Sequence, residues 1–70
     1  MKRYVVETVQ YEKDGNSIRR VLEKNFFHNK ENAELFAKTE LRYLLENEGV
    51  ILSEVKKDGY EFIEEHKRGE

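Results

Sequence analysis

The side chains best suited to acid–base or metal chemistry lie along this 70-residue chain without a spacing that would bring them together. His28 and His66 stand far apart, and neither belongs to a metal-binding pattern such as H-x-x-x-H. Glu64 and Glu65 are adjacent, so on a strand they would point to opposite faces. The chain contains no cysteine, which excludes a disulfide framework and a Cys-based zinc site. We therefore predict a non-catalytic protein with no metal site, no cofactor and no small-molecule substrate.

Glutamates dominate the second part of the chain. Residues 31–70 carry eleven acidic and six basic side chains, whereas residues 1–30 carry four acidic and seven basic ones. Glu46 and Glu48 are expected in the last turn of a helix, where the helix dipole disfavours anions, and such local violations are often found at functional positions. Together with the glutamates of the last two strands they predict an acidic ridge that faces a basic partner surface: Glu46, Glu48, Glu54, Glu61, Glu64 and Glu65. A solvated, charged surface is the alternative interpretation.

Basic and aromatic residues together characterise the first part of the chain. The basic residues that could contact a nucleic-acid backbone are Arg3, Lys13, Arg19, Arg20 and Lys24, with Tyr4, Tyr11 and Phe27 nearby for base stacking. Glu7, Glu12 and Glu23 interrupt this pattern, and the zinc-finger, RRM and KH motifs are absent from the sequence. A nucleic-acid-binding module is therefore the alternative to a protein-binding function.

Two Lys-Asp-Gly turns, at residues 13–15 and 57–59, must position these groups. Each turn lies between runs rich in β-branched and aromatic residues, which predicts two hairpins. We expect strands over residues 3–12, 17–27, 50–57 and 60–66, with a helix that is capped by Asn29 and ends at Gly49. The sequence thus predicts an α+β fold of order ββαββ, with one four-stranded antiparallel sheet and a single helix packed across one face.

Cross-strand pairing indicates the register of the first hairpin. If Asp14 faces Ser17, then Glu7 meets Lys24 and Val5 meets Phe26. The same register pairs Glu12 with Arg19 and Val9 with Leu22, and it places Val5, Val9, Leu22 and Phe26 together on one face. In the second hairpin a loop at Asp58-Gly59 pairs Lys56 with Glu61 and Val55 with Phe62.

The predicted helix has two apolar stripes. At 100° per residue the first comprises Ala33, Ala37, Leu41, Leu44 and Leu45, and the second comprises Phe36 and Tyr43. Glu40 falls between the stripes and needs a partner or access to water.

A single helix is too narrow to cover a four-stranded sheet, so one face should keep exposed apolar side chains that mark a contact site. We expect this self-association or partner face to comprise Tyr4, Val6, Val21, Phe27, Leu52 and Ile63. Because a small domain without disulfides is only marginally stable, a homodimer is expected. The sequence predicts one domain over residues 1–70 with a frayed tail at 67–70, no membrane span, and a cytoplasmic location. The leading hypothesis is a small regulatory protein that acts by protein–protein interaction, such as a phage or mobile-element inhibitor of a host protein that itself binds nucleic acid.

Overall fold

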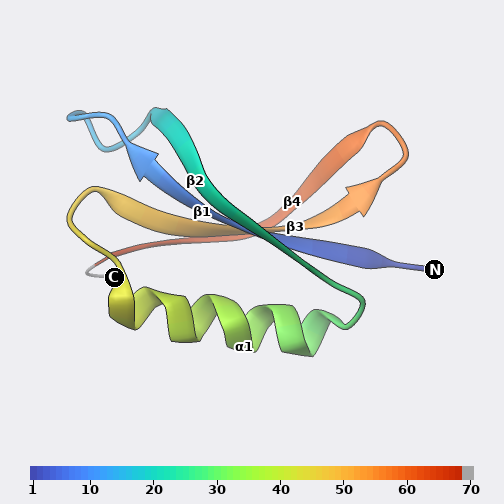
Figure 1. Cartoon of the computed structure of the whole chain (residues 1–70). Coiled ribbons are helices and arrows are strands. Elements are labelled where there is room, and N and C mark those ends of the chain that lie inside the picture. Colours follow the sequence, from blue (N-terminus) through green and yellow to red (C-terminus); the bar gives the residue numbers. More distant parts are fainter. Residues whose placement is uncertain (69–70) are drawn as a thin grey trace.

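Two hairpins flank one helix in the computed structural model, which describes residues 1–68. The elements are β1 (Arg3–Tyr11), β2 (Ile18–Phe27), α1 (Lys30–Glu40), a short 3-10 helix η1 (Leu41–Tyr43), β3 (Glu48–Lys56) and β4 (Gly59–Lys67). The four strands form one antiparallel sheet, and α1 lies across one of its faces (Figure 1). This confirms the predicted ββαββ architecture.

The strand order in the sheet is β2-β1-β3-β4, which places the first strand of each half at the centre. β2 and β4 are therefore the two edges of the sheet. The chain crosses from edge strand β2 through α1 to central strand β3, and α1 contacts β1 and β3 most extensively. This route holds the helix along the middle of the sheet and leaves both edge strands partly uncovered.

The first hairpin has the predicted register over only half of its length. Val5 pairs with Phe26 and Glu7 pairs with Lys24, as expected. Two register shifts follow, so that Val9 pairs with Val21 instead of Leu22. At the turn, Glu12 N–H donates to the Ser17 carbonyl at 2.7 Å, and Glu12 does not pair with Arg19. The predicted pairing of Asp14 with Ser17 across a two-residue turn is wrong, because the Asp14 carboxylate instead accepts from the backbone N–H groups of a longer loop.

The predicted register of the second hairpin is also wrong, by two residues. Lys56 pairs with Gly59 and Val55 pairs with Tyr60, so Lys57 and Asp58 occupy the centre of the turn. A turn centred on Asp58-Gly59 would require a positive φ at Asp58. Within this turn the positive φ is that of Gly59, at 139°. Gly59 is the fourth residue of the turn, a position where glycine is favoured.

The helix begins as predicted and ends earlier. The Asn29 side chain accepts hydrogen bonds from the backbone N–H groups of Glu31 and Asn32, so Asn29 is the N-cap. The helix ends at Glu40, and the chain becomes extended at Leu44 after the 3-10 turn. Gly49, predicted as the C-terminal residue of the helix, lies in β3, where the Tyr11 ring packs closely against it.

The main core lies between α1 and the central strands. Its buried members are Tyr4, Val6, Ala33, Ala37, Leu44, Val50 and Leu52, and Phe27, Phe36, Leu41 and Ile63 pack against them. Small side chains at Ala33 and Ala37 let the helix approach the sheet closely, and the rings of Phe27 and Phe36 lie 5.2 Å apart beside them. Of the two predicted stripes, Leu45 and Tyr43 remain exposed because the helix ends before them.

The predicted assignment of the two sheet faces is therefore inverted. Tyr4, Val6, Phe27, Leu52 and Ile63 were expected on the uncovered face, but the helix covers them. Pairing within the first hairpin shows which residues share a face, but it does not show which face the helix selects. The selected face joins Val6 of β1 to Leu52 of β3, which are directly paired, and so provides a continuous apolar surface beneath the helix.

The C-terminal strand continues further than expected. Lys67 is the last residue of β4, and Arg68 N–H donates to the Glu48 carbonyl at 3.0 Å. The predicted frayed tail therefore does not begin at residue 67, and residues 69–70 lie outside the described part of the chain. Within residues 1–68, no helix is long and apolar enough to cross a membrane.

Candidate functional site on the open face of the sheet

The sheet face opposite α1 is the candidate site, and we call it the open face. Its members follow from strand alternation and register. They are Arg3, Val5, Glu7, Val9 and Tyr11 of β1, Ile18, Val21, Leu22, Lys24 and Phe26 of β2, Gly49, Ile51, Ser53 and Val55 of β3, and Tyr60, Phe62, Glu65 and Lys67 of β4. Neither α1 nor any other described element packs over this face (Figure 1).

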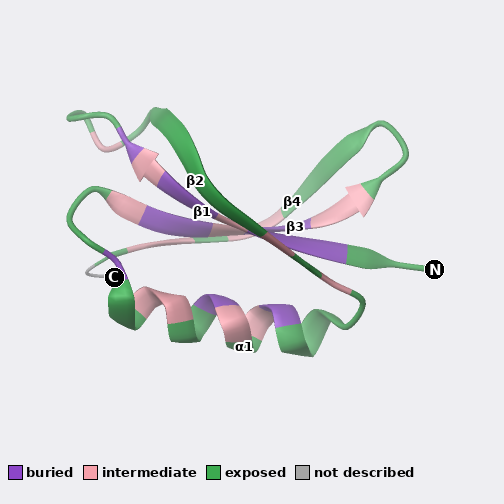
Figure 2. Ribbon diagram, viewed as in Figure 1, coloured by how far each residue is buried: buried purple, intermediate pink, exposed green. Residues whose placement is uncertain are grey.

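The centre of the open face is buried even though no element covers it. Val5 and Val9 are completely inaccessible, and Tyr11 is 4% exposed. Most of β1 is buried (Figure 2). Side chains from the two edge strands reach over this centre, since Lys24 Nζ of β2 lies 3.4 Å from Tyr60 Oη of β4. Edge strands separated by two others would lie about 14 Å apart in a flat sheet. Their side chains therefore converge above β1 and β3.

The rim of the open face carries large apolar side chains that remain in water. Phe62 is 62% exposed, Phe26 is 48% exposed, and Tyr60 is 42% exposed. The β2 strand adds Ile18, Val21 and Leu22, each 40–48% exposed. The register shift opposite Val9 places Val21 and the adjacent Leu22 on the same face, because alternation is interrupted there. Exposed apolar surface of this extent is typical of an interaction site.

Cations cover some of the aromatic rings on this face. The Arg3 guanidinium lies 5.0 Å from the centroid of the Phe26 ring, and Lys24 Nζ lies 5.1 Å from that of Tyr60. Lys24 Nζ is also 3.9 Å from the Glu7 carboxylate. Arg3 and Lys24 thus make cation–π contacts within the protomer, and Lys24 also makes an ionic contact. The open face has both charge signs, and its net charge is close to zero.

One end of the open face is organised around Tyr11. The Tyr11 hydroxyl donates a hydrogen bond to Glu65, and Lys67 Nζ lies 5.0 Å from the Tyr11 ring centroid. Lys67 Nζ also donates to the Gly15 carbonyl at 2.6 Å. The Tyr11 ring lies over Gly49, where a Cβ atom would come within 2.8 Å of ring carbon Cε2. This cluster connects the first turn to β4 and gives Gly49 its structural role.

The predicted acidic ridge is divided between different surfaces. Glu54 pairs with Glu61 on the helix side of the sheet, whereas Glu65 lies on the open face. Glu46 lies in the loop before β3, and the Glu48 carboxylate accepts from Leu45 N–H at 2.8 Å. Neither of these two glutamates lies in a helix, so the argument from the helix dipole does not apply to them.

The remaining acidic positions are partly compensated. Lys56 Nζ lies 3.2 Å from Glu54, and this hydrogen-bonded carboxylate raises the pKa of Lys56. Glu64 lies 3.6 Å from His66 Nε2. Glu40 is half-buried at the end of α1, and no ion pair to it is found within residues 1–68. The glutamates therefore do not form one continuous charged ridge.

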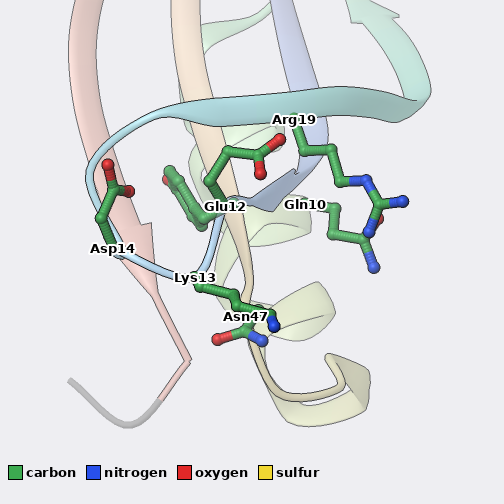
Figure 3. A pocket seen from close by; sticks show the side chains of 7 residues that line it. Gln10, Glu12, Lys13, Asp14, Arg19 and Asn47 are labelled. Carbon is green, nitrogen blue, oxygen red and sulfur yellow. The ribbon is translucent and has the colours of Figure 1, made fainter.

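The predicted basic residues of the first hairpin are also dispersed. Arg3 and Lys24 lie on the open face, whereas Arg20 Nε donates to the Gln10 side chain at 3.1 Å. Arg19 and Lys13 line a pocket of about 500 Å³ near the first turn (Figure 3). The pocket lining is Gln10, Tyr11, Glu12, Lys13, Asp14, Arg19 and Asn47. The lining mixes both charge signs, because Glu12 and Asp14 lie beside Lys13 and Arg19.

Asp14 has a structural role beside this pocket. The backbone N–H groups of Asn16 and Ser17 donate to its carboxylate at 2.8 and 3.1 Å. These hydrogen bonds lower the pKa of Asp14 below its ordinary value. The carboxylate therefore stabilises the turn in its charged form.

A second pocket, of about 400 Å³, lies between β2 and the helix. Its lining is Phe27, Asn32, Leu35, Phe36 and Thr39. It contains no titratable side chain, and its one hydroxyl group, that of Thr39, donates to the Leu35 carbonyl at 2.9 Å. Within residues 1–68, no group of three or more His, Cys, Asp or Glu side chains is arranged to hold a metal ion.

Comparison with known proteins gives no assignment: no family model, no curated protein and no solved structure matches the chain significantly.

Val21 lies on the interaction face as predicted from the sequence, whereas the exposed aromatic residues of that face were not predicted there. Phe26, Tyr60 and Phe62 are exposed on the open face, although Phe26 was grouped with the face beneath the helix. One signal was present, because Tyr60 and Phe62 alternate with the charged residue Glu61. The error in the second register placed Phe62 opposite Val55, although it lies opposite Ser53 in a row that ends at Phe26.

Proposed function

We propose that this chain is a small non-catalytic protein that binds another protein through the open face of its sheet. The observation that supports this proposal is the exposure of Phe26, Tyr60 and Phe62 on one uncovered sheet face, beside Ile18, Val21 and Leu22. Large aromatic side chains are enriched at protein interfaces because each buries a large area with few rotatable bonds. The acidic ridge is not part of the proposal, since its members lie on different surfaces.

A protein partner is favoured over a nucleic acid by the charges of the open face. Lys24 is already engaged with Glu7 and Tyr60, and Arg3 lies over the Phe26 ring. A strand of nucleic acid needs cations for its phosphates and uncovered rings for its bases. On the open face Arg3 and Lys24 already lie against the partly exposed rings of Phe26 and Tyr60, and Phe62 is the most exposed ring of that face. These contacts oppose the nucleic-acid alternative.

A regulatory or inhibitory action would follow from occupancy alone. A protein that covers a surface of its partner competes with whatever else binds there, and this requires no reactive group. The proposed partner is a host protein in the cytoplasm. The proposal assigns this chain a binding surface and not a reaction.

Affinity capture with matched variants tests the proposed surface. Immobilised wild type, Phe62→Ser and Leu35→Ser are exposed to the same bacterial lysate, and the retained proteins are compared. Leu35 is the matched control because it is 66% exposed, close to the 62% of Phe62, but lies on the helix. We expect Phe62→Ser to lose retained proteins that Leu35→Ser keeps.

The same three proteins are then tested with fluorescent single-stranded and duplex DNA at low salt. Binding that weakens steeply as salt rises, by roughly one decade for every two phosphate contacts across a four-fold change in salt, would favour the nucleic-acid alternative. Identical capture by wild type and Phe62→Ser would contradict the proposed surface.

A further inference from the structure

We infer that the protein on the open face is a second copy of this chain, packed face to face about a two-fold axis. This inference rests on the proposed function, because it names the occupant of the same surface in the free protein, which a host protein would have to displace. Two antiparallel sheets that pack face to face keep their strands within about 30° of each other. Such a dimer would cover the exposed aromatic rim of both copies at once.

The dimensions of the sheet suit this arrangement. The principal-axis extents of the molecule are 37 × 25 × 17 Å, so its broad face is on the scale of the roughly 800 Å² per partner that a standard interface buries. The core of a chain this short provides little stability by itself, and self-association is one of the ways in which small domains compensate. The ten-residue strand β2 is almost entirely exposed in the protomer, which leaves much apolar area to bury.

The register defines rows of residues that run across the open face. One row runs Phe26, Val5, Ser53, Phe62, from β2 to β4. The next row runs Lys24, Glu7, Ile51, Glu65 in the same direction. The two end residues of each row are therefore complementary. Both are aromatic in the first row, and in the second row one is a cation and the other is an anion.

A two-fold axis parallel to the strands, midway between β1 and β3, uses this complementarity. The axis places β2 of one copy over β4 of the other and keeps each row over itself. Phe26 then lies opposite the partner's Phe62. Lys24 lies opposite the partner's Glu65, and its ammonium group would exchange its contacts with Glu7 and Tyr60 of its own copy for this one. Each contact occurs twice by symmetry, as required of an isologous interface.

The exposure of the side chains agrees with contact at the edges of the sheet. The middle of the first row is already buried in the protomer, with Val5 at 0% and Ser53 at 3% exposure, and the middle of the second row, Glu7 and Ile51, is half-buried. The ends of the first row, Phe26 and Phe62, remain exposed at 48% and 62%. The surface available to a second copy is therefore the surface that the proposed axis brings together.

Charge reversal gives the sharpest test, because each variant alone should disrupt the dimer and mixing the two variants should restore it. Lys24→Glu alone places two Glu–Glu pairs across the interface, and Glu65→Lys alone places two Lys–Lys pairs there. Mixing the two variants restores both opposite-charge pairs in a heterodimer. Mass is measured by sedimentation velocity and light scattering at concentrations up to about 100 μM, where micromolar affinity is detectable.

We expect wild type to dimerise, each single variant to remain monomeric over the same range, and the mixture to dimerise again. Circular dichroism is used to check that each variant remains folded. Phe62→Ser should weaken self-association at least about 30-fold, whereas Leu35→Ser should leave it unchanged.

Wild type that stays monomeric at about 100 μM would overturn the second-copy inference. The proposed function would then be judged separately by the capture comparison of Phe62→Ser with Leu35→Ser, which needs no dimer. A dimer that Leu35→Ser disrupts and Phe62→Ser does not would also overturn the inference, because the interface would lie on the helix side. Failure of the mixture to dimerise, with wild type dimeric, would reject the proposed axis.

Discussion

Gly49 provides a direct test of how β1 and β3 pack beneath the Tyr11 ring. A Cβ atom at this position would lie 2.7 Å from the His66 carbonyl oxygen, 2.8 Å from Tyr11 Cε2 and 2.9 Å from Tyr11 Oη. Carbon atoms normally approach no closer than about 3.5 Å. Tyr11 is 4% exposed and its hydroxyl is bonded to Glu65, so the ring has little freedom to move.

Steric overlap at Gly49 reverses the sign that Gly49→Ala would otherwise have. In an unobstructed strand, alanine is more favourable than glycine by about 0.5–1 kcal/mol, because glycine loses more backbone entropy on folding. At Gly49 we expect destabilisation by about 2 kcal/mol, within the range of about 1–3 kcal/mol observed for overpacked cores. For a domain of this size that corresponds to a fall in Tm of roughly 8–16 °C.

Urea and thermal unfolding followed by circular dichroism measure this change. Gly15→Ala is the control, because Gly15 has φ 76° and a Cβ atom added there would meet no other atom within 4 Å. Gly15→Ala therefore measures backbone strain without steric overlap, whereas Gly49→Ala measures steric overlap at a residue whose φ is not positive. In a Tyr11→Ala background the Gly49→Ala penalty should fall but not vanish, because the His66 carbonyl remains. Unchanged or increased stability of Gly49→Ala in the wild-type background would refute the packing argument.

Two further substitutions test local structure. Asn29→Ala removes the acceptor for the N–H groups of Glu31 and Asn32 and should cost about 1 kcal/mol in urea unfolding, whereas Asn29→Asp should be nearly neutral; equal stability of all three proteins would show that the cap is dispensable. The lowered pKa of Asp14 means that its charged form adds stability at neutral pH, and that this contribution is lost as pH falls below the ordinary value of 3.8. Between neutral and strongly acidic pH, the urea midpoint should therefore fall less for Asp14→Asn than for wild type. Equal falls in the two proteins would contradict this role.

The order and type of the elements could be predicted because they depend on local chemistry. Asn29 caps a helix through its own side chain, and the glycine of each turn adopts a positive φ that other residues avoid. Half of the first register was also predictable, since Glu7 with Lys24 and Val5 with Phe26 are favourable neighbours on paired strands. These features need information from only a few residues.

The bulges and the end of the helix were not predictable from local pattern. Leu22 and Val9 appeared to be an apolar pair, but the strand shifts there and Val21 takes that place. Gly49 resembled a helix C-cap by type and position, whereas its real constraint is the Tyr11 ring from another strand. Both outcomes depend on residues distant in sequence, which local pattern does not include.

The amino-acid sequence by itself determined two hairpins, one capped helix and the absence of cysteine chemistry, because each follows from side-chain and backbone preferences at neighbouring positions. Only the tertiary structure decided which face of the sheet the helix covers. Both faces contain enough apolar residues to form a core, and the choice depends on the strand order and on how closely Ala33 and Ala37 approach Val6 and Leu52. That choice buries Tyr4 and leaves Phe62 exposed, and so it determines where a partner can bind.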